Sequence, residues 1–415
     1  MEEFAQTSRE WIMENDMTSL SMNDGKQANT VCDMLIAAEA TPNHYAINVV
    51  WWTNVFCLPL IAFVGLACNT LNMLILTNNA STKRMPSSNL LLALALCDSC
   101  FLIFATIEVT PASISSIIAS PLFNHLYIHS VLYIRTFAST FYKTSVLIVV
   151  AFNMERYICV CHPLYSHRLC TTRSSRIAIA ICFGISLLCS LQWPICYYIK
   201  ECWHNSLGHT FYIILLNENP TIQIYYRFMD YFSLIGFNML PVIALLLLNT
   251  KLVITLHKVI DQDVARVNSQ ITHIESYGMR SLTVQRFNAN AMLFAVVLLL
   301  LICVGPQVPA RLLFDYYGQY HETAVLYTCV SQQLVFLNAS LNFCLYCLVS
   351  RKYRSLLQQT IKRFFDKARR YDSSMALRRF GKKASQQRTT ISDDMHISSK
   401  KTTQPFSAIP LLRQH

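Results

Sequence analysis

The sequence predicts an all-α fold, a bundle of seven membrane-spanning helices followed by a short amphipathic helix on the membrane surface. Of the 415 residues, 53% are hydrophobic and only 14% are charged, whereas soluble domains carry about 25% charged residues. The charges also lie between long apolar runs, and a bilayer core ~30 Å thick needs about 20 apolar residues per helix. Because backbone polar groups cannot be left unpaired in hydrocarbon, these runs are expected to be helices.

Seven apolar runs meet this length requirement. Five of them contain no Asp, Glu, Lys or Arg, whereas the second contains one acid, Asp98, and the third contains one base, Lys143. The predicted spans, in chain order, are Tyr45–Thr82, Met85–Ile107, Thr136–Met154, Ile177–Ile199, Tyr231–Thr250, Phe287–Ala310 and Thr323–Ser350.

The distribution of bases predicts the orientation of the bundle. With the N-terminus outside, 26 of the 34 Lys and Arg residues fall on the inner side, six on the outer side and two in the third span. An excess of Lys and Arg marks cytoplasmic loops, so we expect a multi-pass plasma-membrane protein with an extracellular N-terminus and a cytoplasmic C-terminus. The expected parts are an extracellular tail (1–48), the seven-helix domain (49–350), an amphipathic helix (351–365) and a disordered cytoplasmic tail (366–415).

Residues 351–365 carry apolar side chains at three- and four-residue spacings, with bases on the other face. Such a helix lies on an anionic lipid surface, which makes membrane lipid an expected partner. The net charge of +11 is then explained by the inner leaflet, and we expect no nucleic-acid partner.

Polar side chains recur inside the spans, where they are costly and are functional candidates by default. Asp98 lies in the middle of the second span, and Arg156 follows Glu155 at the inner end of the third. Any one of them could be an ordinary interhelical hydrogen-bonding group, but their occurrence in successive spans favours a function. The other members of the set are Asn69, Asn338, Asn342 and Tyr346.

These residues form motifs whose order resembles the rhodopsin-like G-protein-coupled receptor family over about residues 49–365. Each motif alone is weak, but six in order across seven spans are specific. The matching residues are Asn69 in the first span, Leu94, Ala95 and Asp98 in the second, Glu155-Arg156-Tyr157 and then Pro163-Leu164 at the third, Pro241 in the fifth, Cys303 and Pro306 in the sixth, and Asn342 and Tyr346 in the seventh.

The resemblance implies a switch that activates a heterotrimeric G protein. In this family the arginine, here Arg156, is held by its neighbouring acid at rest and is released towards the G protein when the sixth helix moves outward. Pro306 would provide a hinge, and Leu164 would insert into the G protein. The implied switch residues are Glu155, Arg156, Tyr157, Leu164, Pro306, Asn342 and Tyr346.

A second implied site surrounds Asp98. The family's arrangement suggests either a bound sodium ion, since this cation favours oxygen ligands near a desolvated carboxylate, or a water-filled polar network. No other cofactor or metal is expected, because the Cys and His residues show no zinc-ligand spacing. The residues of this site are Asn69, Asp98, Ser145, Asn338 and Asn342.

The outer half of the bundle carries the expected ligand pocket. Ala138 stands where amine receptors of the family have an aspartate, which argues against a monoamine ligand, and the seventh span has no lysine for a retinal Schiff base. Glu108 is the expected partner for an arginine of the ligand. Arg311 could instead extend its charged group to the lipid interface, and this alternative is left open. The pocket residues are expected to be Glu108, Arg135, Ala138, Lys143 and Arg311.

The sequence also departs from the family pattern. Val304, Phe343, Arg286 and Asn249 replace residues that usually surround the switch, and Val131 replaces the usual cysteine at the top of the third span. Three cysteines are expected to face the exterior, so at most one disulfide forms among them. Pairing of Cys202 with either Cys32 or Cys329 is left open.

Several strings resemble invertebrate FMRFamide-type neuropeptide receptors, among them Lys83-Arg84-Met85-Pro86-Ser87-Ser88-Asn89 and Asn338-Ala339-Ser340-Leu341-Asn342-Phe343. The resemblance implies an amidated peptide ligand, with a sensory chemoreceptor for a small environmental molecule as the alternative. A seven-helix transporter is disfavoured because inverted repeats are not evident. No catalytic constellation is present, so we expect no enzyme. Ser and Thr residues among bases in the tail suggest kinase sites that recruit arrestin.

Overall fold

The computed structural model describes residues 44–78, 87–114, 120–204, 208–269, 295, 297–317, 321–349 and 353–363, with three single positions after them. The chain divides into two compact units, Met1–Arg354 and Ser355–His415, and each is treated by itself. The predicted N-terminal tail and cytoplasmic tail lie almost wholly outside the described residues. Residues 353–363 are helical, as the apolar spacing predicts.

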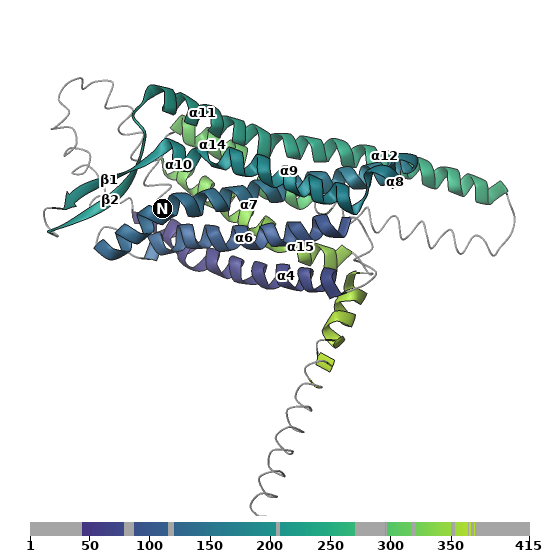
Figure 1. Cartoon of the computed structure of the whole chain (residues 1–415). Helices are drawn as coiled ribbons and strands as arrows, with labels where there is room; N and C mark the ends of the chain where they lie inside the picture. The colour runs from purple at the N-terminus through teal and green to yellow at the C-terminus, as the bar shows by residue number, and fades with distance from the viewer. Residues whose placement is uncertain are drawn as a thin grey trace, which may run out of the picture. The chain divides into compact units, whose positions relative to one another are not determined.

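Seven helices of the described chain are long and apolar enough to cross a membrane, which confirms the predicted bundle. They lie side by side (Figure 1). The first comprises α3 (His44–Trp52), η1 (Thr53–Cys57) and α4 (Leu58–Asn78), the second α6 (Ser87–Ile114), the third α7 (Pro121–Cys161), the fourth α9 (Thr172–Ser190) with α10 (Gln192–Cys196), the fifth α11 (Pro220–Ser233), η2 (Leu234–Met239) and α12 (Leu240–Ser269), the sixth residues 297–304 with α14 (Gln307–Tyr317), and the seventh α15 (Glu322–Val349).

The largest extensions beyond the predicted boundaries are in α7 and α12. α7 begins at Pro121 instead of Thr136, because the charge of Arg135, which set the predicted boundary, is buried by protein and never faces lipid. α12 continues past Lys251 to Ser269. A helix satisfies its own backbone hydrogen bonds in water as well as in lipid, so hydropathy does not mark its end.

Prolines interrupt three of the spans. The π-helical turns η1 and η2 each end two residues before a proline, Pro59 and Pro241 respectively. A proline removes a backbone donor and its ring crowds the preceding turn, which a widened turn accommodates. In the sixth span the helix stops at a turn formed by Gly305 and Pro306, and α14 starts directly after it.

A two-stranded hairpin accompanies the predicted all-α bundle. β1 (Tyr197–His204) pairs antiparallel with β2 (His209–Leu216), in a register that sets Tyr197 opposite Leu216. The fourth span therefore ends at Cys196 and not at Ile199. The apolar run continues across this boundary, but aromatic and β-branched residues suit a pleated, half-buried strand, and β1 begins there. The hairpin lies at one end of the bundle and α8 (Pro163–Leu169) at the other (Figure 1).

Close packing joins the first and seventh spans, where Gly65 of α4 faces Ser340 of α15. A Cβ atom at Gly65 would lie 2.3 Å from the Ser340 Oγ, so only glycine permits this approach. One turn later, the Asn69 amide donates a hydrogen bond of 3.0 Å to the carbonyl of Ala339. The glycine and the amide together fix the register of these two helices.

Candidate functional site

A cavity of about 360 Å³ opens between the helices on the hairpin side of the bundle. Its walls come from α6, α7, α10, β1, α11, η2, α14 and α15. All five residues that the sequence assigns to a pocket line it, namely Glu108, Arg135, Ala138, Lys143 and Arg311.

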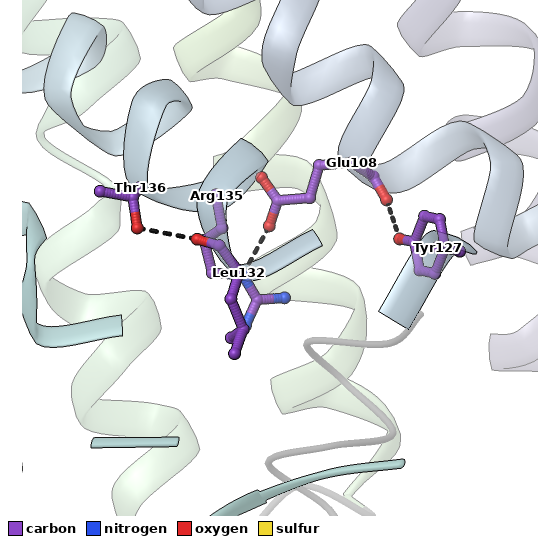
Figure 2. A network of polar contacts seen from close by, with 5 residues as sticks. All are labelled: Glu108, Tyr127, Leu132, Arg135 and Thr136. Atoms are coloured by element: carbon purple, nitrogen blue, oxygen red, sulfur yellow. Dashed lines mark hydrogen bonds and ion pairs between the residues drawn. The ribbon is translucent and has the colours of Figure 1, made fainter. Parts of the chain in front are cut away.

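Glu108 of α6 and Arg135 of α7 form an ion pair inside this cavity. The Arg135 Nε lies 2.7 Å from the Glu108 Oε1, with the two side chains 6% and 11% exposed (Figure 2). The Arg135 guanidinium also lies 4.9 Å from the ring centroid of Trp193, and the Tyr127 hydroxyl donates to the backbone carbonyl of Glu108. A buried carboxylate requires a cation, and in this structure Arg135 supplies it. The expected pairing of Glu108 with a ligand arginine stays a prediction.

A second ion pair joins α14 to α11. The Arg311 Nη2 lies 2.7 Å from the Asp230 Oδ2, and the Arg311 Nε lies 3.6 Å from the Asp315 Oδ1. Tyr231 donates a hydrogen bond of 3.0 Å to Asp315. Asp230 also lines the cavity but is missing from the predicted pocket, since it directly precedes the apolar run of the fifth span. The sequence could have indicated Asp230, since an acid beside a predicted span is a possible partner for the base Arg311 of the sixth span.

Lys143 of α7 is 5% exposed and lies about two turns after Arg135 along the helix. Its Nζ donates to the Cys189 carbonyl at 3.1 Å and to the Ser190 hydroxyl at 3.3 Å. The same nitrogen lies 5.3 Å from the ring centroid of Phe237. Within the part of the chain that the structure describes, no carboxylate lies within 4.0 Å of it.

The apolar part of the cavity is formed around Ala138, which is 4% exposed. Ala138 packs in one cluster with Phe101, Val335 and Phe336, and the rings of Phe101 and Phe336 stack with their centroids 5.2 Å apart. A small side chain at position 138 keeps this space open. The cavity thus combines an aromatic wall with charged and polar groups.

Several polar atoms of the cavity wall are buried and lack a hydrogen-bond partner among the described residues. They include donors and acceptors, so a molecule in the cavity could satisfy them only by offering both kinds of group. These atoms are the Gln192 Oε1, the Trp193 Nε1, the Ser233 Oγ and the Thr328 Oγ1.

Asp98 forms the centre of a separate polar network within the bundle. Its carboxylate is 1% exposed and accepts hydrogen bonds from the Ser145 Oγ at 2.5 Å and the Asn342 Nδ2 at 2.8 Å. Asn69 instead bonds Ala339, and no side-chain hydrogen bond joins Asn338 to Asp98 in the described structure. Three of the five predicted network residues are therefore in contact.

The composition of this network fits a sodium ion. No base lies within 4.0 Å of the Asp98 carboxylate among the residues described, and a buried carboxylate without a cation is costly. The Ser145 hydroxyl can supply a further oxygen, and the buried Oδ1 atom of Asn69 has no partner in the described structure. Oxygen donors of this kind suit a hard cation.

Glu155, Arg156 and Tyr157 lie near the end of α7, opposite the hairpin. The Arg156 guanidinium lies 5.2 Å from the ring centroid of Phe152, and Glu155 interacts with the Ser175 hydroxyl and with the charge of Arg156. Leu164 follows on the short helix α8 and is 89% exposed. We call this region, Glu155–Ser175, the Arg156 end.

The remaining switch candidates lie in the sixth and seventh spans. Pro306 lies at the helix break, and Asn342 belongs to the Asp98 network. Tyr346 is 1% exposed, and its hydroxyl has no hydrogen-bond partner among the described atoms. Asn249, the replacement in the fifth span, donates to the Asn153 Oδ1 at 3.4 Å. Asn153 lies one turn before Arg156 on α7. Arg286, another residue that departs from the family pattern, lies outside the described residues.

Of the two partners left open for Cys202, the structure excludes Cys329. Cys202 is disulfide-bonded, whereas Cys329 is a free, buried thiol, 3.0 Å from the Thr53 hydroxyl. Cys329 fails as a partner because it packs between the first and seventh spans, in a cluster with Val50. The remaining candidate, Cys32, lies outside the described residues.

The hairpin is attached to α7 without a disulfide at Val131. Val131 packs in an apolar cluster with Cys196, Tyr197 and Ile214. Asn124, fully buried, donates to the Tyr212 carbonyl at 2.9 Å and accepts from the Tyr212 amide at 2.5 Å. The side chain thus pairs with β2 as a neighbouring strand would. Sequence reasoning missed it, because Asn124 lies before the predicted third span.

Comparison with known proteins places residues 68–350 in the family described as 7 transmembrane receptor (rhodopsin family). The relatives include the neuromedin U receptor homolog nmur-2 of Caenorhabditis elegans, 24% identical over 250 residues (52% of this chain, 57% of the relative). They also include the human neuromedin-U receptor 2, 26% identical over 231 residues (53% and 51%), and the mouse probable G-protein coupled receptor 142, 22% identical over 219 residues (52% and 51%). The match covers about half the length of these curated relatives.

Proposed function

Because the chain belongs to the rhodopsin family of seven-transmembrane receptors, whose members are receptors and not enzymes, we propose that it is a G-protein-coupled receptor for a neuropeptide. Two of the relatives are named as neuromedin U receptors, which favours a peptide over other ligand classes. The finer part of the proposal, an amidated peptide similar to FMRFamide, rests on the sequence strings around Lys83–Asn89 and Asn338–Phe343.

The cavity is the observation that carries this proposal. Its wall holds two ion pairs, a buried lysine and unpaired donors and acceptors, next to an aromatic surface. A peptide end, with alternating carbonyl and amide groups and an apolar side chain, matches this mixture. A small apolar environmental molecule would leave the buried polar atoms unpaired, which is costly.

Transmission of the signal is assigned to the Arg156 end. Ligand binding at the hairpin side would favour outward motion of the sixth helix at Gly305 and Pro306, with Asn342 and Tyr346 between the cavity and Arg156. The exposed Leu164 on α8 supports contact with a heterotrimeric G protein. The distribution of bases supports a plasma-membrane orientation with the N-terminus outside. We also propose that a sodium ion binds at Asp98. The cytoplasmic tail is proposed to bind a receptor kinase and arrestin.

Nucleotide exchange on G protein in cells expressing the chain tests this function. The cells are challenged with an amidated-peptide library and, in parallel, with small odorant-like molecules. We expect amidated peptides to stimulate exchange in the wild type and not in Arg156→Ala, while a labelled peptide still binds the variant at the cell surface. Activation by small molecules alone would contradict the peptide assignment and support the chemoreceptor alternative.

A further inference from the structure

We propose that Lys143 and Gln192 form a subsite that binds a primary carboxamide, the end group of an amidated peptide. This inference rests on the proposed peptide-receptor function, and it adds to it the residues that distinguish an amide end from a free acid. The two side chains come from α7 and α10 and line the same cavity.

Lys143 supplies the donor of this subsite. An ammonium group has three N–H donors, and in Lys143 it donates to the Cys189 carbonyl and the Ser190 hydroxyl, both neutral. The third donor is available to an oxygen in the cavity. The side chain is held rigidly by these two bonds and by the Phe237 ring, so the donor is positioned before a ligand arrives.

Gln192 supplies the acceptor. Its side chain is 2% exposed, and the Oε1 atom has no hydrogen-bond partner among the described residues. The two acceptors of the Lys143 nitrogen, on Cys189 and Ser190, lie within three positions of Gln192 in the sequence. One short segment of chain therefore anchors the donor and presents the acceptor.

The pairing of one donor with one acceptor selects the end group. A primary carboxamide offers a carbonyl oxygen to Lys143 and N–H groups to Gln192. A carboxylate offers oxygens only and would leave the Gln192 Oε1 facing a like-signed atom, although Lys143 would attract its charge. An ammonium group would repel Lys143. The aromatic wall of Phe101 and Phe336 fits an apolar side chain on the terminal residue.

The other charged groups of the cavity do not compete for this end group. Glu108 is engaged by Arg135, and Asp230 by Arg311. Both carboxylates of the wall thus lie in ion pairs, and the hydrogen bonds of Lys143 go to neutral acceptors. The negative charge of Asp230 also acts on Lys143, which disfavours a second carboxylate beside the lysine. Among the described residues, neither of the two wall carboxylates lies within 4.0 Å of the Lys143 ammonium.

The test uses two small probes that differ only in the end group, N-acetyl-phenylalaninamide and N-acetyl-phenylalanine. Their binding to the purified full-length receptor is measured by the shift in thermal unfolding as the probe concentration rises. We expect the amide to bind the wild type about 10-fold more tightly, because a buried polar group left unpaired by the acid is costly. Gln192→Leu should bring the two affinities to within about 3-fold of each other, whereas Lys143→Met should weaken both.

Gln333→Leu is the matched control, since the Gln333 Oε1 is also buried without a described partner but Gln333 does not line the cavity. It should keep the wild-type preference. Equal affinity of the two probes for the wild type, or an unchanged preference in Gln192→Leu, would overturn the subsite. Failure of the proposed function has a different signature, because a receptor that binds the amide probe yet gives no cellular response to any amidated peptide retains the subsite without the assigned role.

Discussion

The two ends of the helix bundle differ in whether their charged side chains are paired. At the hairpin end, four of the five charged residues that line the cavity are paired with each other, Glu108 with Arg135 and Asp230 with Arg311. At the Arg156 end, the bases Arg168 and Arg173 are exposed and have no acid within 4.0 Å among the residues described.

The difference indicates what each end can bind. The two ion pairs at the hairpin end, one buried and one partly exposed, neutralise four charges of the cavity wall and leave a small number of polar atoms for a compact ligand. Exposed bases and the exposed Leu164 provide a surface for a large partner, because such groups remain hydrated until the partner covers them. Asp98, between the two ends, accepts only neutral donors from the described chain. The predictions that follow change one region at a time.

The largest effect is expected at the buried pair. Arg135→Met removes the cation next to the Glu108 carboxylate, which is 11% exposed, and should lower the free energy of unfolding by about 3–5 kcal/mol. The double variant Glu108→Gln with Arg135→Met should recover most of this loss, because no charge is then buried. Thermal unfolding of the purified receptor measures both. Equal losses in the single and double variants would show that the pair is not the cause, and Glu218→Gln, at an exposed contact with Tyr198, is the control.

A smaller effect is expected where the hairpin meets α7. Asn124→Leu removes both hydrogen bonds to the Tyr212 backbone and should cost about 1–3 kcal/mol. Hydrogen exchange at the Tyr212 amide should become faster in the variant. Ser130→Ala is the control, since its hydroxyl bonds only carbonyls of its own helix. Unchanged hydrogen exchange in β2 would mean that the apolar cluster around Val131 is sufficient to hold the hairpin against α7.

Sodium at Asp98 should have a still smaller effect on stability. At a sodium concentration ten times the dissociation constant, binding should raise the free energy of unfolding by about 1.4 kcal/mol. Asp98→Asn should abolish this increase because the variant lacks the carboxylate charge. Thermal unfolding in sodium and in potassium at equal ionic strength provides the comparison. The same sodium effect in the variant would place the ion elsewhere.

The smallest effect on stability is expected at Leu164. Its side chain is 89% exposed, so Leu164→Ala should change the free energy of unfolding by less than about 0.5 kcal/mol. Ligand-stimulated nucleotide exchange should nevertheless fall, since this apolar side chain is assigned to the G-protein contact. Leu188→Ala, which changes a 68% exposed side chain of α9, should leave exchange unaltered. Normal exchange in Leu164→Ala would remove α8 from the proposed contact.

The seven spans could be predicted because bilayer thickness fixes the length of an apolar run. Their ends could not, wherever the protein itself buries a charge. Arg135 marked the predicted start of the third span, but its pairing with Glu108 keeps it away from lipid. The hairpin was missed for the opposite reason, since Tyr197–Ile199 continue the apolar run of the fourth span and hydropathy does not separate strand from helix there.

The candidate site was predicted as a set of residues but not as a set of contacts. Glu108, Arg135, Lys143 and Arg311 all line the cavity, since charged residues in an apolar segment require a protein or ligand partner. Which of them pair with each other depends on how the helices pack, and the sequence order carries no such information. Asp230 was missed because it directly precedes the predicted fifth span, where an acid is ordinary. Gln192 was missed because it is an uncharged residue within the predicted fourth span.

The central claim is that a peptide bound in the hairpin-end cavity controls the Arg156 end. The most direct measurement compares binding of a labelled amidated peptide with nucleotide exchange in wild type, Lys143→Met and Arg156→Ala, at matched surface expression. The account predicts that Lys143→Met loses binding and exchange together, whereas Arg156→Ala keeps binding and loses exchange. Full binding and exchange in Lys143→Met, or loss of peptide binding in Arg156→Ala alone, would contradict it.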